Sequence, residues 1–468
     1  MVTTKRALLK ARRRMRVDGK VVWALAWPAV ALNGLQVVNS LLDTFFVGHL
    51  SVNSLTAHGA ALNVIFLMFS LAMTISVAST AMVARAYGAD DPAEYREANR
   101  QCLSLSFVIG LILAAACLVL APLAAPFLVP AGNAEAATLF RNFLTAYALG
   151  VPATAVFTTL SGSMRGIGDT KSPMVISGIQ ILLHMILNFF LIYPNGHHGF
   201  LPFEAPGLGL GLTGAGIAIA VSGWSSAILY FIYTKRTKLG QARFKVPSMD
   251  WVKRIQAIAI PSALQSLLRV GSFTFFTMIL RNTPTAADAL AALRVGIALE
   301  GMMFMPAFGL SVAAGALVGQ SLGAKDPSRA ERLGWTAGHY AAIVILVVSI
   351  PIFIFAPHIA TLLTGGDKPG VAVEAANYIR ILIATEMMFG YAMVLIGAMQ
   401  GAGDAKRTMW ITIATLWAIR VPLAFILTHP AFALGSTGGW IAMSLSQVAQ
   451  GLLAMVYWKR GQWKTVIV

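Results

Sequence analysis

The sequence predicts an all-α membrane protein with twelve transmembrane helices in two six-helix lobes, which are related by an internal repeat of parallel topology. Three observations support this fold class. Apolar residues make up 57% of the 468 residues and charged residues 11%, whereas soluble domains carry roughly 25% charged residues. Many apolar stretches reach the length of about 20 residues that crosses a hydrocarbon core. Two loop motifs also recur at one fixed distance along the chain.

The apolar stretches define the predicted spans. The first two are longer than a bilayer requires, so tilted or bent helices are expected, with Pro28 and Pro306 as candidate bend positions. The approximate ranges of the spans are 21–48, 54–84, 102–125, 143–163, 173–193, 211–233, 257–280, 289–319, 336–356, 376–399, 409–428 and 438–458.

Basic residues lie mainly on one side of these spans. The net charge of +17 would by itself suggest nucleic-acid binding. However, the Lys and Arg residues gather in the termini and in alternate loops, and the opposite loops hold only Arg141, Arg281, Lys368 and Arg380. This asymmetry follows the positive-inside rule. It predicts a multi-pass inner-membrane protein with both termini in the cytoplasm and no nucleic-acid partner.

Two loop motifs are duplicated. The string from Val83 to Pro92 matches the one from Val318 to Pro327, and the string from Leu160 to Lys171 matches the one from Leu395 to Lys406. Both pairs are 235 residues apart. Because both loops lie on the same side in both halves, each repeat contains an even number of spans, six, and the halves are parallel. The Gly-x-Gly-Asp core of the second motif predicts a helix end, a tight turn and an Asp that caps the next helix.

These observations divide the chain into five segments. Cys102 and Cys117 both fall in the third span, so neither a disulfide framework nor a metal site is predicted. The segments are a basic cytoplasmic N-terminal stretch 1–20, an N-terminal lobe 21–233, a cytoplasmic inter-lobe linker 234–256, a C-terminal lobe 257–458 and a cytoplasmic tail 459–468.

The duplicated strings carry a family likeness. Met164–Lys171 and Met399–Lys406, together with Val318–Ala324 and the early Val38–Gly48, resemble the multidrug and toxic compound extrusion (MATE) family over essentially the whole chain. The resemblance implies a secondary antiporter, not an enzyme, that exports small organic, cationic or amphipathic compounds in exchange for protons or sodium ions by alternating access. It implies no cofactor, and we expect a monomer in the lipid bilayer.

Asp43 is the first candidate for ion coupling. It lies in the outer half of the first span and matches the acidic residue that the family uses for this purpose. Ionisable residues inside a membrane are costly and are functional candidates by default. A carboxylate in a cavity can load a proton on one side and release it on the other, or bind sodium with carbonyl and amide oxygens. The alternative is a structural carboxylate that caps the next element at the outer interface.

Polar residues of the fifth span are the predicted partners of Asp43. His184 and Asn188 are four residues apart and therefore share a helix face. The family often has Asn followed by Asn or Asp there, so a second acidic partner is absent. His184 is either a titratable partner or a structural residue with a hydrogen bond. Gln36, seven residues before Asp43, and Gln180, four before His184, extend the predicted cluster.

The C-terminal lobe offers a second set of charges. Arg269 stands where some relatives have Glu, which puts cation coordination in this lobe in doubt. Glu300 and Glu386 lie in the eighth and tenth spans. One interpretation pairs Arg269 with one of these carboxylates, and the other lets a carboxylate face a substrate cavity and attract cations. Met303 is a candidate cavity residue because flexible thioethers adapt to varied shapes.

Two other functional classes fit the sequence less well. A flippase for a lipid-linked sugar or cell-wall precursor is the alternative function, and Arg269 gives it some support because such proteins need cations to hold pyrophosphate. The duplicated Gly-x-Gly-Asp motifs favour the exporter. A membrane enzyme is not supported, since the sequence offers no recognisable metal cluster, catalytic triad or nucleotide loop.

Overall fold

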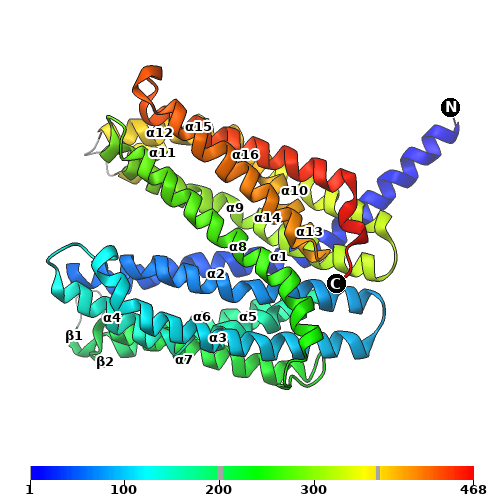
Figure 1. The fold of residues 1–468 in the computed structure, drawn as a ribbon, viewed down its shortest axis with the longest axis horizontal. Helices are drawn as coiled ribbons and strands as arrows, with labels where there is room; N and C mark the ends of the chain where they lie inside the picture. The colour runs from blue at the N-terminus through cyan, green and yellow to red at the C-terminus, as the bar shows by residue number, and fades with distance from the viewer. Residues whose placement is uncertain (1, 198–203, 365–368) are drawn as a thin grey trace. The chain divides into compact units, whose positions relative to one another are not determined.

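The structure, a computed structural model, describes residues 2–197, 204–364 and 369–468. Within these residues ten helices are long and apolar enough to cross a membrane. Two bent pairs bring the number to twelve: α4 (Ala134–Ala148) with α5 (Val151–Gly166), bent by 48°, and α12 (Pro369–Ile383) with α13 (Glu386–Gly401), bent by 57°. The predicted twelve-span, two-lobe helical fold is confirmed (Figure 1). Lys368, one of the outer-side cations, lies outside the described residues.

The helices of the two halves follow one another in the same order. The first half contains, besides α4 and α5, the helices α1 (Val2–Gly48), α2 (Val52–Gly88), α3 (Pro92–Leu128), α6 (Lys171–Ile192) and α7 (Gly211–Thr234). The second half contains, besides α12 and α13, the helices α8 (Met249–Leu280), α9 (Ala286–Gly323), α10 (Pro327–Ile354), α11 (Ala356–Thr364), α14 (Ala405–Thr412), a π-helical segment (Ile413–Arg420), α15 (Val421–Leu427) and α16 (Gly435–Arg460).

One small element departs from the all-α prediction. Between α6 and α7, strands β1 (Pro194–His197) and β2 (Glu204–Leu208) form an antiparallel hairpin. Gly207 in β2 donates its amide hydrogen to Asn195 Oδ1 at 2.6 Å. Glycine is required there because an added Cβ would lie 2.0 Å from the carbonyl oxygen of Tyr193. Hydropathy gave no sign of this hairpin because the segment has few of the apolar, alternating residues that mark a strand.

The chain forms two compact units whose boundaries differ from the expected lobes. One, which we call the C-terminal unit, contains Met1–Val30 and Ile260–Val468, and the other, the N-terminal unit, contains Ala31–Ala259. The boundaries fall inside α1 and α8, close to Pro28 and Pro261. Residues 21–30, expected in the N-terminal lobe, therefore pack with the C-terminal unit, and the basic residues 2–20 form the first part of α1.

The duplicated loops have the turn structure that their sequence predicts. Gly168 and Gly403 have φ of 86° and 91°, the left-handed conformation that glycine tolerates best. Asp169 Oδ1 then accepts a hydrogen bond from the amide of Ser172 at 3.0 Å. Asp404 Oδ1 accepts one from the amide of Arg407 at 3.3 Å. The helix end, tight turn and Asp cap are thus confirmed in both halves.

Equivalent packing contacts hold the two repeats together internally. Ser76 in α2 donates to the carbonyl of Thr158 in α5 at 2.7 Å. Ser311 in α9 donates to the carbonyl of Met393 in α13 at 2.9 Å. Both residues of the second pair lie 235 positions after those of the first. The repeat therefore extends from the loops into the cores of the two units.

Close helix packing in the second unit leads to a stability prediction. A Cβ added to Gly401 would lie 2.1 Å from the carbonyl oxygen of Gly315, which is backbone and cannot rotate away. We expect Gly401→Ala to lower the free energy of unfolding by about 1–3 kcal/mol, measured as a lower thermal unfolding midpoint in detergent. In the matched control Gly301→Ala, the added carbon meets no described atom within 4 Å. Unfolding midpoints that fall equally in both variants would contradict the prediction.

The linker between α7 and α8 lies against α2 and α3. Lys238 Nζ donates to Tyr87 Oη at 2.7 Å, and this hydrogen bond raises the pKa of Lys238 above its ordinary value. Lys245 Nζ contacts Glu97 Oε1, also at 2.7 Å. Lys238 and Lys245 therefore anchor the linker to α2 and α3. Part of the basic charge thus has a structural role and does not require a nucleic-acid partner.

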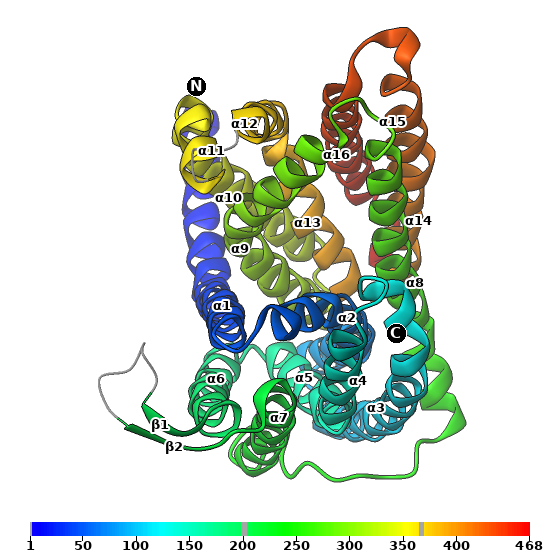
Figure 2. The same ribbon diagram turned by 90° about the vertical axis from the view of Figure 1, so that its left-hand side faces the viewer.

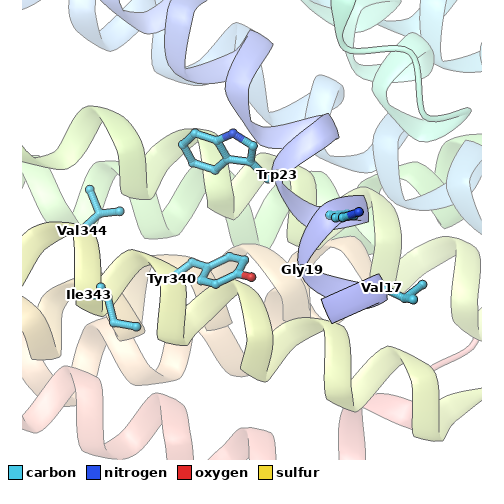
Figure 3. Close-up of a pocket in the computed structure, with 7 residues that line it drawn as sticks. Val17, Gly19, Trp23, Tyr340, Ile343 and Val344 are labelled. Carbon is cyan, nitrogen blue, oxygen red and sulfur yellow. The ribbon is translucent and has the colours of Figure 1, made fainter. Parts of the chain in front are cut away.

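A groove of about 670 Å³ runs between the start of α1 and α10 in the C-terminal unit (Figure 3). Trp23, Tyr340 and Ile343 form much of its lining. The helices meet closely at Gly19, where an added Cβ would lie 2.1 Å from the Tyr340 hydroxyl. The absence of a side chain at this position lets α1 pack against α10.

Candidate functional site

The structure brings Asp43 of α1 together with the polar face of α6. Asn188 Nδ2 donates to Asp43 Oδ1 at 2.7 Å. Asn39, one turn earlier in α1, donates from Nδ2 to Asp43 Oδ2 at 3.2 Å. His184 Nε2 lies 3.7 Å from Asp43 Oδ1. We call these four residues the Asp43 cluster.

Asn39 fixes the proton on the ring of His184. Its Nδ2 is used as a donor to Asp43, so its Oδ1 is available only as an acceptor. His184 Nδ1 lies 3.0 Å from this Oδ1 and must therefore carry a hydrogen. In the neutral ring, Nε2 is then the nitrogen with the free lone pair, and it faces the carboxylate.

Two atoms of the cluster remain available for a proton or a cation. The side chain of His184 is 5% exposed and that of Asp43 is 18% exposed. Within the described residues, His184 Nε2 and Asn188 Oδ1 are buried and accept no hydrogen bond. Because buried polar atoms are rarely left without a partner, the arrangement is suited to bind one additional proton or small cation.

The other predicted members of this cluster lie outside it. Gln36 is exposed and Gln180 is half-buried. In the part of the chain that the structure describes, neither has a hydrogen bond to Asp43 or His184. Asn39, by contrast, was not singled out from the sequence. Its position four residues before Asp43, on the same helix face, was the available signal.

A second polar cluster lies within the C-terminal unit, and we call it the Glu386 cluster. Tyr378 Oη donates to Glu300 Oε1 at 2.6 Å. Gln447 Nε2 donates to Glu386 Oε1 at 3.3 Å, while Oε2 of this fully buried residue has no hydrogen-bond partner among the described residues. Arg420 interacts electrostatically with both carboxylates.

Arg420, not Arg269, is the cation buried with these carboxylates. Arg420 is 8% exposed, and its Nε donates to Ser446 Oγ at 2.8 Å. Arg269 is exposed, and none of its described contacts is an ion pair with Glu300 or Glu386. Arg420 ends the π-helical segment, whose irregular turn alters which residues face the unit's interior. Among the described residues the expected ion pair of Arg269 with a carboxylate is not found, and Arg420 is the cation that interacts electrostatically with Glu300 and Glu386.

Met303 lies in the hydrophobic core of the C-terminal unit. It is 3% exposed and packs with other buried apolar residues of that unit. A side chain enclosed in this way contributes to packing, which differs from the cavity position expected from the sequence.

The chain is similar to known membrane proteins over most of its length. The family model MatE matches residues 28–190 and 261–426, once in each half of the chain. The probable multidrug resistance protein NorM of Thermotoga maritima is 27% identical over 448 residues, which are 94% of this chain and 92% of that protein. The multidrug resistance protein MdtK of Yersinia pseudotuberculosis is 25% identical over 453 residues, covering 94% and 95%.

A solved structure shares the fold over nearly the full length. It is described as the outward-facing conformation of a multidrug resistance MATE family transporter of the MOP superfamily. The TM-score is 0.85 at 21% sequence identity, covering 96% of this chain and 97% of that chain. Because the MatE model matches well over half of the residues and does so in both repeats, this chain belongs to the MATE family of transporters.

Proposed function

We propose that this protein is a proton-coupled antiporter that exports small organic, cationic or amphipathic compounds across the bacterial inner membrane. The names of the relatives, multidrug resistance proteins of bacteria, support the substrate class and the membrane. The coupling ion rests on one observation, the approach of His184 Nε2 to Asp43 Oδ1 at 3.7 Å.

The Asp43 cluster is suited to exchange one proton. A deprotonated Nε2 beside an ionised carboxylate places two electron-rich atoms together in a buried site, which is unfavourable. One proton removes the conflict, on either Asp43 or His184. Loading from the outside and release to the inside would couple this proton to the opposite movement of a substrate.

Sodium is the alternative coupling ion. Hard cations prefer oxygen ligands, and the cluster offers the Asp43 carboxylate and Asn188 Oδ1. His184 can offer only a nitrogen ligand, and Asn39 Oδ1 already accepts a hydrogen bond from His184 Nδ1. The residues therefore support a proton better than sodium.

The Glu386 cluster supports the structural interpretation of the C-terminal carboxylates. Glu300 and Glu386 are buried within their own unit and have Tyr378, Gln447 and Arg420 as partners. We therefore propose no substrate contact for them. The flippase alternative is not favoured, because the matching family model and the relatives are those of multidrug transporters.

The test is transport in proteoliposomes under separately imposed gradients. The purified protein is reconstituted, and the movement of ethidium is followed by fluorescence. We expect a proton gradient alone to drive transport and a sodium gradient alone to leave it at the level of empty vesicles. Transport driven only by sodium would contradict proton coupling. The absence of transport under either gradient would contradict the proposed antiporter function.

Asn39 provides a second prediction for the same assay. Asn39→Leu removes the donor to Asp43 and the acceptor for His184 at similar volume. Hydrogen bonds to charged groups contribute about 1.5–3 kcal/mol, so we expect proton-driven transport to fall roughly tenfold or more. The control is Gln36→Leu, three residues away on the same helix and exposed. Equal transport by the two variants would remove Asn39 from the coupling site.

A further inference from the structure

A groove of about 450 Å³ between α6 and α7 lies outside both polar clusters. The two helices run side by side in the N-terminal unit (Figures 1 and 2). At one end, Ser172 Oγ donates to Tyr233 Oη at 2.9 Å and joins the helices. The remaining walls are apolar and open outward, since Val175, Ile179 and Ile232 are 54%, 48% and 54% exposed.

Two cations flank the hydroxyl end of this groove. Lys171 and Arg236 both line it and both are exposed. Across the described residues, neither side chain forms a hydrogen bond or an ion pair. The acidic residue nearest in sequence, Asp169, is used as the cap of α6 through the amide of Ser172.

Three other cations of the linker and the start of α8 have side-chain partners. Lys238 contacts Tyr87, Lys245 contacts Glu97, and Arg254 contacts Glu94. The positive charge of Lys171 and Arg236 is therefore distinct from the general basic character of the linker. It lies where the Ser172–Tyr233 hydroxyl pair meets an open apolar groove.

We propose that this groove binds an anionic phospholipid. The lipid phosphate lies between Lys171 and Arg236 and is hydrogen-bonded by the Ser172–Tyr233 hydroxyl pair. One acyl chain follows Val175, Ile179 and Ile232 along the groove. Cations beside an apolar wall match the order of charged head group and hydrocarbon chain in a lipid, and basic pockets between transmembrane helices are suited to anionic head groups.

The site also gives a role to a residue of the duplicated motif. Lys171 has the counterpart Lys406 in the second repeat, 235 residues later. Lys406 is likewise exposed at the start of a helix, α14, but it is followed by Arg407, which pairs with Asp404 at 2.5 Å. Lys406 is therefore the matched control: the same motif and charge without the groove's second free cation.

Native mass spectrometry of the purified full chain tests the proposal. The protein in detergent is titrated with dioleoyl phosphatidylglycerol and, separately, with dioleoyl phosphatidylcholine. We expect phosphatidylglycerol to bind at least tenfold more tightly, and Lys171→Ala with Arg236→Ala to abolish this preference. Lys406→Ala and the charge-conserving Lys171→Arg should retain it.

Two further arms separate a lipid from a free anion. Val175→Trp fills part of the apolar groove and leaves the cations in place. Because less room remains for the acyl chain, phosphatidylglycerol binding should weaken several-fold. Inorganic phosphate in millimolar excess should not displace the lipid. The proposal is overturned if the double alanine variant keeps its preference, if Val175→Trp binds the lipid normally, or if inorganic phosphate competes fully. None of these readouts depends on transport.

Discussion

Replacing Asp43 by Asn is expected to abolish proton-driven export and to leave the fold intact. Asn has the shape of Asp and still accepts a hydrogen bond from Asn188 or Asn39 through its Oδ1. It cannot bind and release a proton, so His184 Nε2 loses the group with which it shares one. In proteoliposomes with a proton gradient, ethidium transport should fall to the level of empty vesicles.

The control for this variant is another acidic residue of the same helix. Asp18 lies in α1 and contacts Arg332 at 3.5 Å, within the C-terminal unit. Ion pairs of this kind, with the Arg side chain 44% exposed, contribute little, so Asp18→Asn should keep most of the transport. Monodisperse elution of both variants shows that they fold. Full transport by Asp43→Asn would place proton coupling at another residue.

The sequence was sufficient for the features that depend on local chemistry. Gly168 and Gly403 sit in turns that only a flexible backbone adopts easily, and Asp169 and Asp404 cap the next helices. Their common spacing therefore gave the repeat and the number of spans. The approach of His184 and Asn188 to Asp43 was expected from the family resemblance, and their spacing of four residues explains only why both face the same neighbour.

The remaining features depend on which helices become neighbours, and hydropathy carries no such information. A lipid-facing and a protein-facing apolar residue look alike in sequence, so the packing of residues 21–30 with the C-terminal unit was not foreseen. For the same reason, the sequence does not single out Arg420. Its role depends on Glu300 and Glu386, which lie on two other helices and approach it only in the folded unit.

Arg420→Leu is expected to cause the largest loss of stability. The Arg420 guanidinium is buried beside two carboxylates, Glu300 at 9% exposure and Glu386 at 0%. Leucine removes the electrostatic interaction of Arg420 with both carboxylates. It also removes the hydrogen bond to Ser446 Oγ, and a hydrogen bond to a charged group contributes about 1.5–3 kcal/mol. The thermal unfolding midpoint of the purified protein in detergent should therefore fall clearly below that of the unmodified chain.

Two variants separate charge compensation from simple loss of packing. Arg294→Leu removes an exposed arginine of α9 in the same unit and should leave the midpoint nearly unchanged. Adding Glu300→Gln and Glu386→Gln to Arg420→Leu removes the uncompensated negative charge and should recover most of the lost stability, because polar amides at these positions carry no charge to bury. If the triple variant is as unstable as Arg420→Leu alone, then Arg420 stabilises the unit through packing and its hydrogen bond to Ser446, and not through the two carboxylates.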